Sequence, residues 1–235
     1  MNFSIKRVNA IFQKDFKDFS RNLAVSVVIF MPLLIAALYG RMGVDTLQAH
    51  YMIINLTFAM VATYVQCCLI AEEKEKNTLR GLMLSPASTF EILGGKSLLT
   101  FVMTIIIIIL SAMLSDYQPA NLLIVSSAIL LSSFFYIALG TMLGLWAKSV
   151  MESSVIVLPV LGIFSFGSFA VPLAEKYSIL KAAEYLPSVQ LIEIASKVET
   201  GAGFGDVAAQ FGIIFLWVLA AIILTVAVYR KRMVD

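Results

Sequence analysis

Two neighbouring groups of polar residues have the types and spacing that could do chemistry. The first is a charged run from Glu72 to Arg80, with the sequence EEKEKNTLR. The second is Gly95-Lys96-Ser97, which matches the end of a phosphate-binding loop. Such a loop also needs a glycine five residues before its second glycine, so that backbone N–H groups can surround the phosphates. That position is Phe90, and no β-strand is predicted before it, so we expect no nucleotide site on this chain.

Residues that could catalyse a reaction or move ions are scarce in the apolar parts of the sequence. No Asp, Glu, Lys, Arg or His lies inside the apolar segments, although such residues usually mark proton and ion pathways through membranes. The one histidine, His50, is expected at an outer boundary as an interfacial residue rather than a ligand. Cys67 and Cys68 are adjacent, so their side chains diverge on a helix and favour neither a disulfide nor a metal pair. We expect no catalytic residue, no metal site and no nucleic-acid binding. The sequence does not exclude an ion site built from backbone carbonyls.

The elements that position these groups are predicted to be membrane-spanning helices. Hydrophobic residues make up 60% of the chain and its mean hydropathy is +0.92, whereas about half of a soluble domain is apolar. The apolar residues form blocks of about 20 residues, the length of helix that crosses the hydrocarbon core. We therefore predict an all-α integral membrane protein with one transmembrane domain over residues 1–235. Its six transmembrane helices are expected at Asn22–Gly40, Tyr51–Ala71, Ser97–Ser115, Asn121–Ala147, Ser153–Leu173 and Ala208–Tyr229.

The distribution of Lys and Arg predicts which side of the membrane each loop occupies. With both termini inside, all but four of the 17 Lys and Arg residues lie in cytoplasmic segments, the exceptions being Arg41, Lys176, Lys181 and Lys197. Cytoplasmic loops are enriched in these residues. We therefore expect a multi-pass protein of the cell (plasma) membrane with both termini in the cytoplasm. No cleavable signal peptide is expected, because the first apolar segment begins only at Asn22.

Residues 1–21 are predicted to form an amphipathic interfacial helix. Apolar residues recur there at helical spacing, and Lys, Arg and Asp fill the remaining positions. This pattern is typical of a helix that lies in the headgroup plane with its apolar face in the acyl boundary. The alternative is an ordinary basic flank that only sets the topology.

The segment 173–207 is the longest predicted extracytoplasmic piece. Pro159 and Gly162 interrupt the preceding span, so a kinked or broken helix is expected there. Two short helices are predicted at Ile179–Leu186 and Ser188–Val198, on either side of Pro187. Their apolar residues should not face bulk water, so the pair is expected to re-enter the outer leaflet or to cap the bundle.

The spacing of Gly140 and Gly144 predicts a close contact between helices. The two glycines form a small-xxx-small pattern, which lets helix backbones approach each other. We favour packing within the subunit over a dimer interface.

The loop 72–90 carries the charged run and joins the second span to the third. Ser85 can cap the next helix with Pro86 at its first position, and Ser88 with Glu91 offers an alternative capping box. Gly95, with the adjacent Gly94, would let the third span enter close to its neighbours. The alternative for the whole loop is a solvated cluster of charges between two helices.

The residues around this loop resemble the signature of type-2 ABC exporter permeases, the transmembrane subunits of ATP-binding-cassette transporters. The similarity lies in EEKEKNTL at 72–79, LSP at 84–86 and EILGGK at 91–96. In that family the segment forms a cytoplasmic coupling helix, which docks into a groove on a separate ATPase subunit. The resemblance covers nearly the whole chain, because the start resembles the family's elbow helix and later prolines resemble those flanking two short outer re-entrant helices. Two positions depart from the family pattern: Asn77 replaces a common glycine, and Arg80 replaces an acidic residue.

The resemblance implies roles for particular residues. Electrostatic docking would involve Glu72, Glu73, Glu75 and Arg80, and apolar anchoring would involve Leu79 and Leu82. Together with Thr78, these residues form the expected ATPase-docking set. The outer re-entrant or gate region would contain Pro172, Tyr185, Pro187 and Ser188. No cofactor is implied on this chain, since ATP and Mg would bind to the partner ATPase.

The function implied is that of a bacterial exporter's permease subunit. It would work with two copies of a cytoplasmic ABC ATPase and face a second permease copy or a related permease within the lipid bilayer. Its apolar helices suit an amphipathic or hydrophobic cargo, such as a peptide, a drug or a lipid-like molecule. Two other functions stay open: an ion-coupled transporter or channel without an ATPase, and a non-transporting membrane scaffold or sensor.

Overall fold

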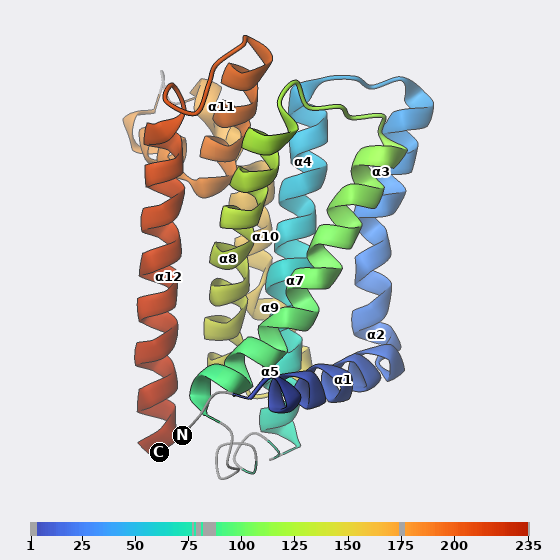
Figure 1. Cartoon of the computed structure of the whole chain (residues 1–235), viewed down its shortest axis with the longest axis vertical. Coiled ribbons are helices and arrows are strands. Elements are labelled where there is room, and N and C mark those ends of the chain that lie inside the picture. Colours follow the sequence, from blue (N-terminus) through green and yellow to red (C-terminus); the bar gives the residue numbers. More distant parts are fainter. Residues whose placement is uncertain (1–3, 77, 79–80, 82–87, 174–176, 235) are drawn as a thin grey trace.

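The computed structural model describes residues 4–76, 78, 81, 88–173 and 177–234, and every element within these ranges is helical (Figure 1). Five helices in this part of the chain are long and apolar enough to cross a membrane, at Leu47–Glu75, Glu91–Leu114, Leu122–Trp146, Val150–Val171 and Ala208–Arg230. The predicted all-α, multi-pass membrane architecture is confirmed. The first predicted span corresponds to a shorter apolar helix, Val27–Met42, so the count of six spans stays a prediction.

The N-terminal helix α1 (Ile5–Arg21) lies across one end of the bundle, beneath the long helices (Figure 1). It packs against α7, and its apolar side buries Ile11 and Phe19. The chain then turns at Asn22 into α2 (Leu23–Ser26), a 3-10 turn (Val27–Ile29) and α3 (Phe30–Met42). Both the amphipathic pattern and the place of this helix agree with an interfacial element.

The second span is the central helix of the bundle and is almost entirely buried. It consists of α4 (Leu47–Thr57), a π-helical stretch (Phe58–Val65) and α5 (Gln66–Glu75). Thr46 starts it, because its hydroxyl accepts a hydrogen bond from the Ala49 N–H. The span is longer at both ends than the predicted Tyr51–Ala71, so the first charged residues of the run belong to this helix.

The helices α7 (Thr89–Leu114) and α8 (Leu122–Trp146) follow as an antiparallel pair (Figure 1). The capping box of Ser88 and Glu91 begins α7, with both reciprocal hydrogen bonds present. The other predicted cap, Ser85 with Pro86, lies outside the described residues. The span of α7 therefore starts about two turns before the predicted Ser97, and this extension brings Lys96 into the bundle.

Two glycines let α8 approach the central span within the subunit. A Cβ atom added to Gly140 would lie 2.5 Å from the carbonyl oxygen of Thr63, and one added to Gly144 would lie 2.7 Å from that of Cys67. Neither contact leaves room for a methyl group. The small-xxx-small pattern therefore marks intramolecular packing, as favoured from the sequence.

The fifth span is broken, as its Pro and Gly predicted. It comprises α9 (Val150–Ile156), α10 (Leu158–Phe166) and a 3-10 stretch (Gly167–Leu173), with the break at Val157. Pro159 follows at once and has no N–H to continue the helical hydrogen bonds.

Two short helices follow at the end of the bundle opposite α1. They are the 3-10 helix η4 (Ser178–Tyr185) and α11 (Pro187–Glu199), close to the predicted bounds. Leu191 and Ile194 of α11 are fully buried, which agrees with a helix that caps the bundle, while its re-entry into a leaflet stays a prediction. The last helix, α12 (Ala208–Val234), runs back along α8.

Candidate functional site

Four charged side chains from three helices meet at the α1 end of the bundle. We call this group the buried charge network: Lys14 and Asp15 of α1, Glu73 of α5 and Lys96 of α7. The Lys96 ammonium lies 2.8 Å from Glu73 Oε1 and 3.3 Å from Asp15 Oδ2, and Lys14 also contacts Glu73 and Asp15. Asp15, Glu73 and Lys96 are all at most 4% exposed. Charges taken out of water to this extent must be paired.

The crossing of α1 over α7 brings this network together. A Cβ added to Gly95 would lie 2.9 Å from Ile11, so a glycine is needed where the two helices touch. Close by, Arg7 and Glu91 form an ion pair of 2.7 Å, and Glu91 also accepts hydrogen bonds from the Ser4 and Ser88 N–H groups. The start of α7 is therefore fixed to α1 by charge as well as by packing.

Electrostatics within α1 follow from this burial. Desolvation acts against the charge on Lys14, but the neighbouring Glu73 and Asp15 outweigh it and raise the Lys14 pKa. Burial raises the pKa of Asp15, and Lys96 and Lys14 oppose that rise. The network thus holds the desolvated Asp15 carboxyl beside the strongly held charge of Lys14.

The predicted docking residues divide between the interior and the surface. Glu73 is buried in the network, whereas Glu75 is exposed and accepts a hydrogen bond of 3.0 Å from the Val150 N–H at the start of α9. Glu72 pairs with Lys76 one turn later at 2.5 Å. Thr78 donates to the Glu73 carbonyl, while Leu79, Arg80 and Leu82 lie outside the described residues. A direct docking role for these residues stays a prediction, and the geometry of Glu73 indicates that it positions the loop from within.

Lys74 has a structural role that the sequence did not reveal. Its ammonium donates to the carbonyl oxygens of Leu145 and Ala147, at 2.6 and 2.5 Å. These carbonyls end α8, where a cation is favourable. Since Lys74 and Glu75 contact the C-terminus of α8 and the N-terminus of α9, the end of α5 is joined to the fourth and fifth predicted spans.

The predicted outer residues lie where η4 and α11 meet the spans. Pro187 begins α11, and the carbonyl of the buried Ser188 accepts a hydrogen bond of 3.4 Å from Asn55 of the central span. The carbonyl of the exposed Tyr185 accepts one of 2.7 Å from the Trp217 indole. Pro172 lies in the 3-10 stretch before η4. Ser188 thus joins α11 to α4, and Tyr185 joins η4 to α12, while a gating role for these residues stays a prediction.

His50, expected at an interface, is instead buried. It is 3% exposed, with its ring between Asp45 at 3.0 Å and Ser115 at 3.2 Å. The ring also stacks on Tyr117. Through Ser115 and Tyr117, His50 links α4 to the end of α7.

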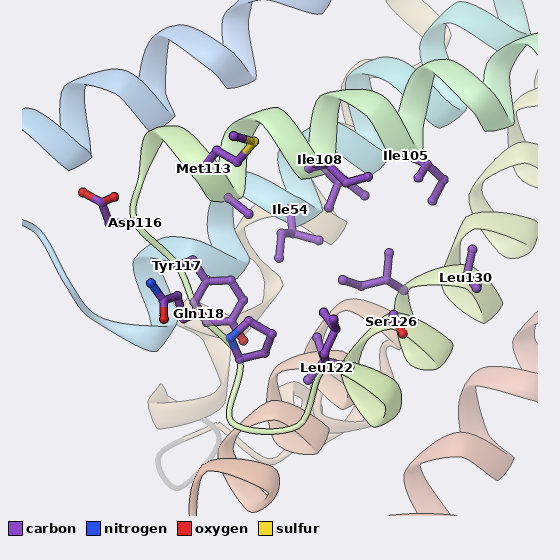
Figure 2. A pocket seen from close by; sticks show the side chains of 15 residues that line it. Ile54, Ile105, Ile108, Met113, Asp116, Tyr117, Gln118, Leu122, Ser126 and Leu130 are labelled. Carbon is purple, nitrogen blue, oxygen red and sulfur yellow. The ribbon is translucent and has the colours of Figure 1, made fainter.

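An apolar groove of about 710 Å³ lies between α7 and α8, with its floor on α4 (Figure 2). Ile54 of α4 and Ile108 of α7 face it, together with Leu122 and Leu130 of α8. Its polar residues, apart from Ser126, gather at one end, at Asp116, Tyr117 and Gln118. The run of five isoleucines at 105–109 was the available sequence signal, but the sequence alone did not show which of them share a face.

The comparison with known proteins gives the family. A search of curated proteins found no match to this chain. A family model described as ABC-2 family transporter protein matches residues 13–229, which is nearly the whole chain and includes every helix from α2 to α11. This match confirms the resemblance drawn from the charged loop. The chain belongs to the ABC-2 transporter permease family, whose members are the membrane translocation components of ATP-binding-cassette transporters.

Proposed function

We propose that this chain is the permease subunit of an exporter that moves an amphipathic or hydrophobic molecule out of the cytoplasm. ATP would be hydrolysed, with Mg, on two copies of a separate ATPase. The observation that carries the proposal is the buried charge network, because it joins the start of the loop 72–90 to α1 and to the spanning helix α7. A displacement of that loop by a docked ATPase would reach both helices through buried ion pairs rather than through flexible side chains.

The positions of the termini support the predicted orientation. Both ends of the chain lie at the α1 end of the bundle (Figure 1). A chain that starts and ends on one side crosses the membrane an even number of times, which supports Val27–Met42 as a sixth span. With the α1 end in the cytoplasm, the exposed Glu75 and Thr78 face an ATPase.

The groove of Figure 2 supports the class of cargo. Its wall is mostly apolar, with Asp116 and Gln118 at the end away from α1. An apolar chain fits such a wall, and a polar group fits its far end. A hydrophilic ion would find no favourable contacts along this apolar wall.

The test is whether the chain stimulates an ATPase through the loop. The tagged chain is purified from its native membrane, and any co-purified ATPase is assayed alone and after reconstitution with the chain in vesicles. We expect stimulated hydrolysis with the wild type, and loss of most of that stimulation with Leu79→Ala/Leu82→Ala. Glu199→Gln, at the opposite end of the bundle, is the control and should stimulate normally.

Two results would contradict the proposal. One is a chain that purifies without any ATPase, which would favour an ion-coupled transporter or channel. The other is an associated ATPase whose stimulation is unchanged by both loop substitutions. Stimulation without any movement of cargo in vesicles would indicate a scaffold or sensor.

A further inference from the structure

A second cavity, of about 570 Å³, lies at the α11 end of the molecule and plays no part in the function proposed above. Segments far apart in the sequence form its walls: the start of α4, the 3-10 stretch before η4, the end of η4, one face of α11 and the start of α12. The residues that line it are Gln48, Ser168, Val171, Glu184, Tyr185, Val189, Gln190, Ile192, Glu193, Ser196, Gln210 and Ile213. We call it the outer cavity.

The charged residues that line the outer cavity are both acidic. Glu184 ends η4 and Glu193 lies in the middle of α11. Among the described residues, the lysine that contacts them is Lys197, whose ammonium lies 3.4 Å from Glu193. Both partners of that pair are about 40% exposed, so it is a surface pair of small energy and does not neutralise the cavity.

Two buried glutamines hold the Glu193 carboxylate in place. Gln210 of α12 donates to Glu193 Oε1 at 2.7 Å, and Gln190 donates to Glu193 Oε2 at 3.4 Å. Gln190 also donates to the Glu184 carbonyl at 2.7 Å. The two bonds to Glu193 orient its carboxylate, and the bond to the Glu184 carbonyl fixes the Gln190 amide to the end of η4.

The same glutamines leave hydrogen-bond acceptors without partners. Gln190 is 4% exposed and Gln210 is 6% exposed, and the Oε1 atom of each has no partner among the described residues. Leaving a buried acceptor unpaired costs free energy, so such a group in a native structure needs an explanation. Two carboxylates on one cavity favour a positively charged ligand, and the unpaired amide oxygens buried beside Glu193 favour one rich in N–H donors.

The remaining walls select an apolar body for that ligand. Val171, Val189, Ile192 and Ile213 line the cavity next to the acidic residues. Trp217, which hydrogen-bonds the Tyr185 carbonyl, lies one turn further along α12. Trp and Tyr of this kind are enriched where a protein meets the membrane–water interface. The outer cavity therefore offers an acidic wall and an apolar wall side by side, which suit the two parts of an amphipathic molecule at the membrane–water interface.

We propose that the outer cavity binds an ammonium group attached to an apolar chain, with Glu193 and Glu184 as its counter-charges. In the exporter, this cavity would be a binding site for a cationic amphipathic cargo on the outer side of the membrane. That assignment rests on the proposed export function, whereas the binding itself does not. A primary ammonium brings three N–H donors and a positive charge to the Glu193 carboxylate.

Binding can be measured on the permease alone. The chain is placed in phosphatidylcholine nanodiscs, whose quaternary headgroup has no N–H donor, and titrated calorimetrically with octylamine against empty nanodiscs. Octanol is the uncharged probe of matched chain length. We expect saturable octylamine binding in the wild type, at least about tenfold weaker binding to Glu193→Gln, and no saturable binding of octanol.

Controls separate the site from general attraction of cations. Glu199→Gln removes a carboxylate from the same helix but outside the cavity, and should bind octylamine like the wild type. Lys197→Met removes the competing ammonium and should tighten binding. Glu193→Gln preserves the shape of the side chain, and an unchanged unfolding midpoint will show that it is folded.

The outcomes are distinct. Equal octylamine affinity for the wild type and Glu193→Gln, or octanol binding as tight as octylamine, would overturn the proposal. A repeat in nanodiscs that contain phosphatidylethanolamine identifies the natural source: weaker octylamine binding there indicates a lipid headgroup, and unchanged binding indicates a soluble amphipath. No ATPase takes part, so a negative result leaves the docking proposal intact, and failure of the docking test leaves this site intact.

Discussion

The ammonium group of Lys96 lies 2.8 Å from the carboxylate of Glu73, and both side chains are buried at the boundary between the charged loop and the membrane-spanning helices. The two residues are on different helices, and each also pairs with a residue of α1, Lys96 with Asp15 and Glu73 with Lys14. The pair therefore fixes where α5 ends relative to α7 and α1.

Replacing one member of this pair should lower the free energy of unfolding much more than replacing both. Glu73→Leu or Lys96→Met alone leaves an uncompensated buried charge and should lower the free energy of unfolding by about 3 kcal/mol. The double variant keeps the Lys14–Asp15 pair and should lose less than either single variant. Unfolding by SDS in mixed micelles measures this cycle, and a double variant whose loss equals the sum of the singles would show that the pair is not coupled.

The two glycines of α8 should tolerate no side chain. Gly140→Ala or Gly144→Ala places a methyl group within 3 Å of a backbone carbonyl of the central span and should lower the free energy of unfolding by about 1–3 kcal/mol. Gly162→Ala is the matched control, since its added Cβ would have nothing within 4 Å. Its helix should be unchanged or slightly more stable. Equal effects at all three positions in the same SDS assay would exclude the close contact.

Two neighbouring lysines should differ in their effect on stability. Lys74→Met removes a charged donor from the last carbonyls of α8 and should lower the free energy of unfolding by about 1.5 kcal/mol. Lys76→Met breaks only an exposed pair with Glu72, so its effect should stay within about 0.5 kcal/mol. Thermal unfolding of the two variants side by side tests this, and a larger effect at Lys76 would be contrary to it.

The start of α7 should depend on its capping box. Ser88→Ala removes the hydroxyl that accepts from the Glu91 N–H and should lower the free energy of unfolding by about 1 kcal/mol. Ser88→Asp retains an acceptor and should retain most of the stability. If Ser88→Ala is neutral, the alternative cap at Ser85 with Pro86 begins the helix instead.

Local sequence rules predicted the parts of the structure that depend on neighbouring residues. Helical periodicity predicted α1, Ser88 with Glu91 predicted the start of α7, and Pro159 predicted the break in the fifth span. Each depends on contacts or backbone preferences within a few residues. The match of the family model to residues 13–229 agrees with the resemblance found in the loop.

The interior partners of charged residues could not be predicted in this way. The sequence predicts a cytoplasmic segment for Lys96 but not its partner Asp15, which lies 81 residues earlier on a helix that crosses α7. His50 was placed at a boundary, yet it meets Ser115 across the bundle. Such contacts depend on how helices pack, which no periodicity along one helix reveals. The sequence does not indicate the outer cavity for the same reason, because Gln190 and Gln210 belong to different helices.

The π-helical stretch at Phe58–Val65 sets the rotational phase of the central span. A π-helix holds more residues per turn than an α-helix, and one residue of α-helix corresponds to about 100° of rotation. Rewinding this stretch by one residue would turn everything beyond it about the helix axis by that angle. The direction in which Glu72, Glu73 and Glu75 point is therefore set by the winding of a segment inside the membrane, two to four turns away from them.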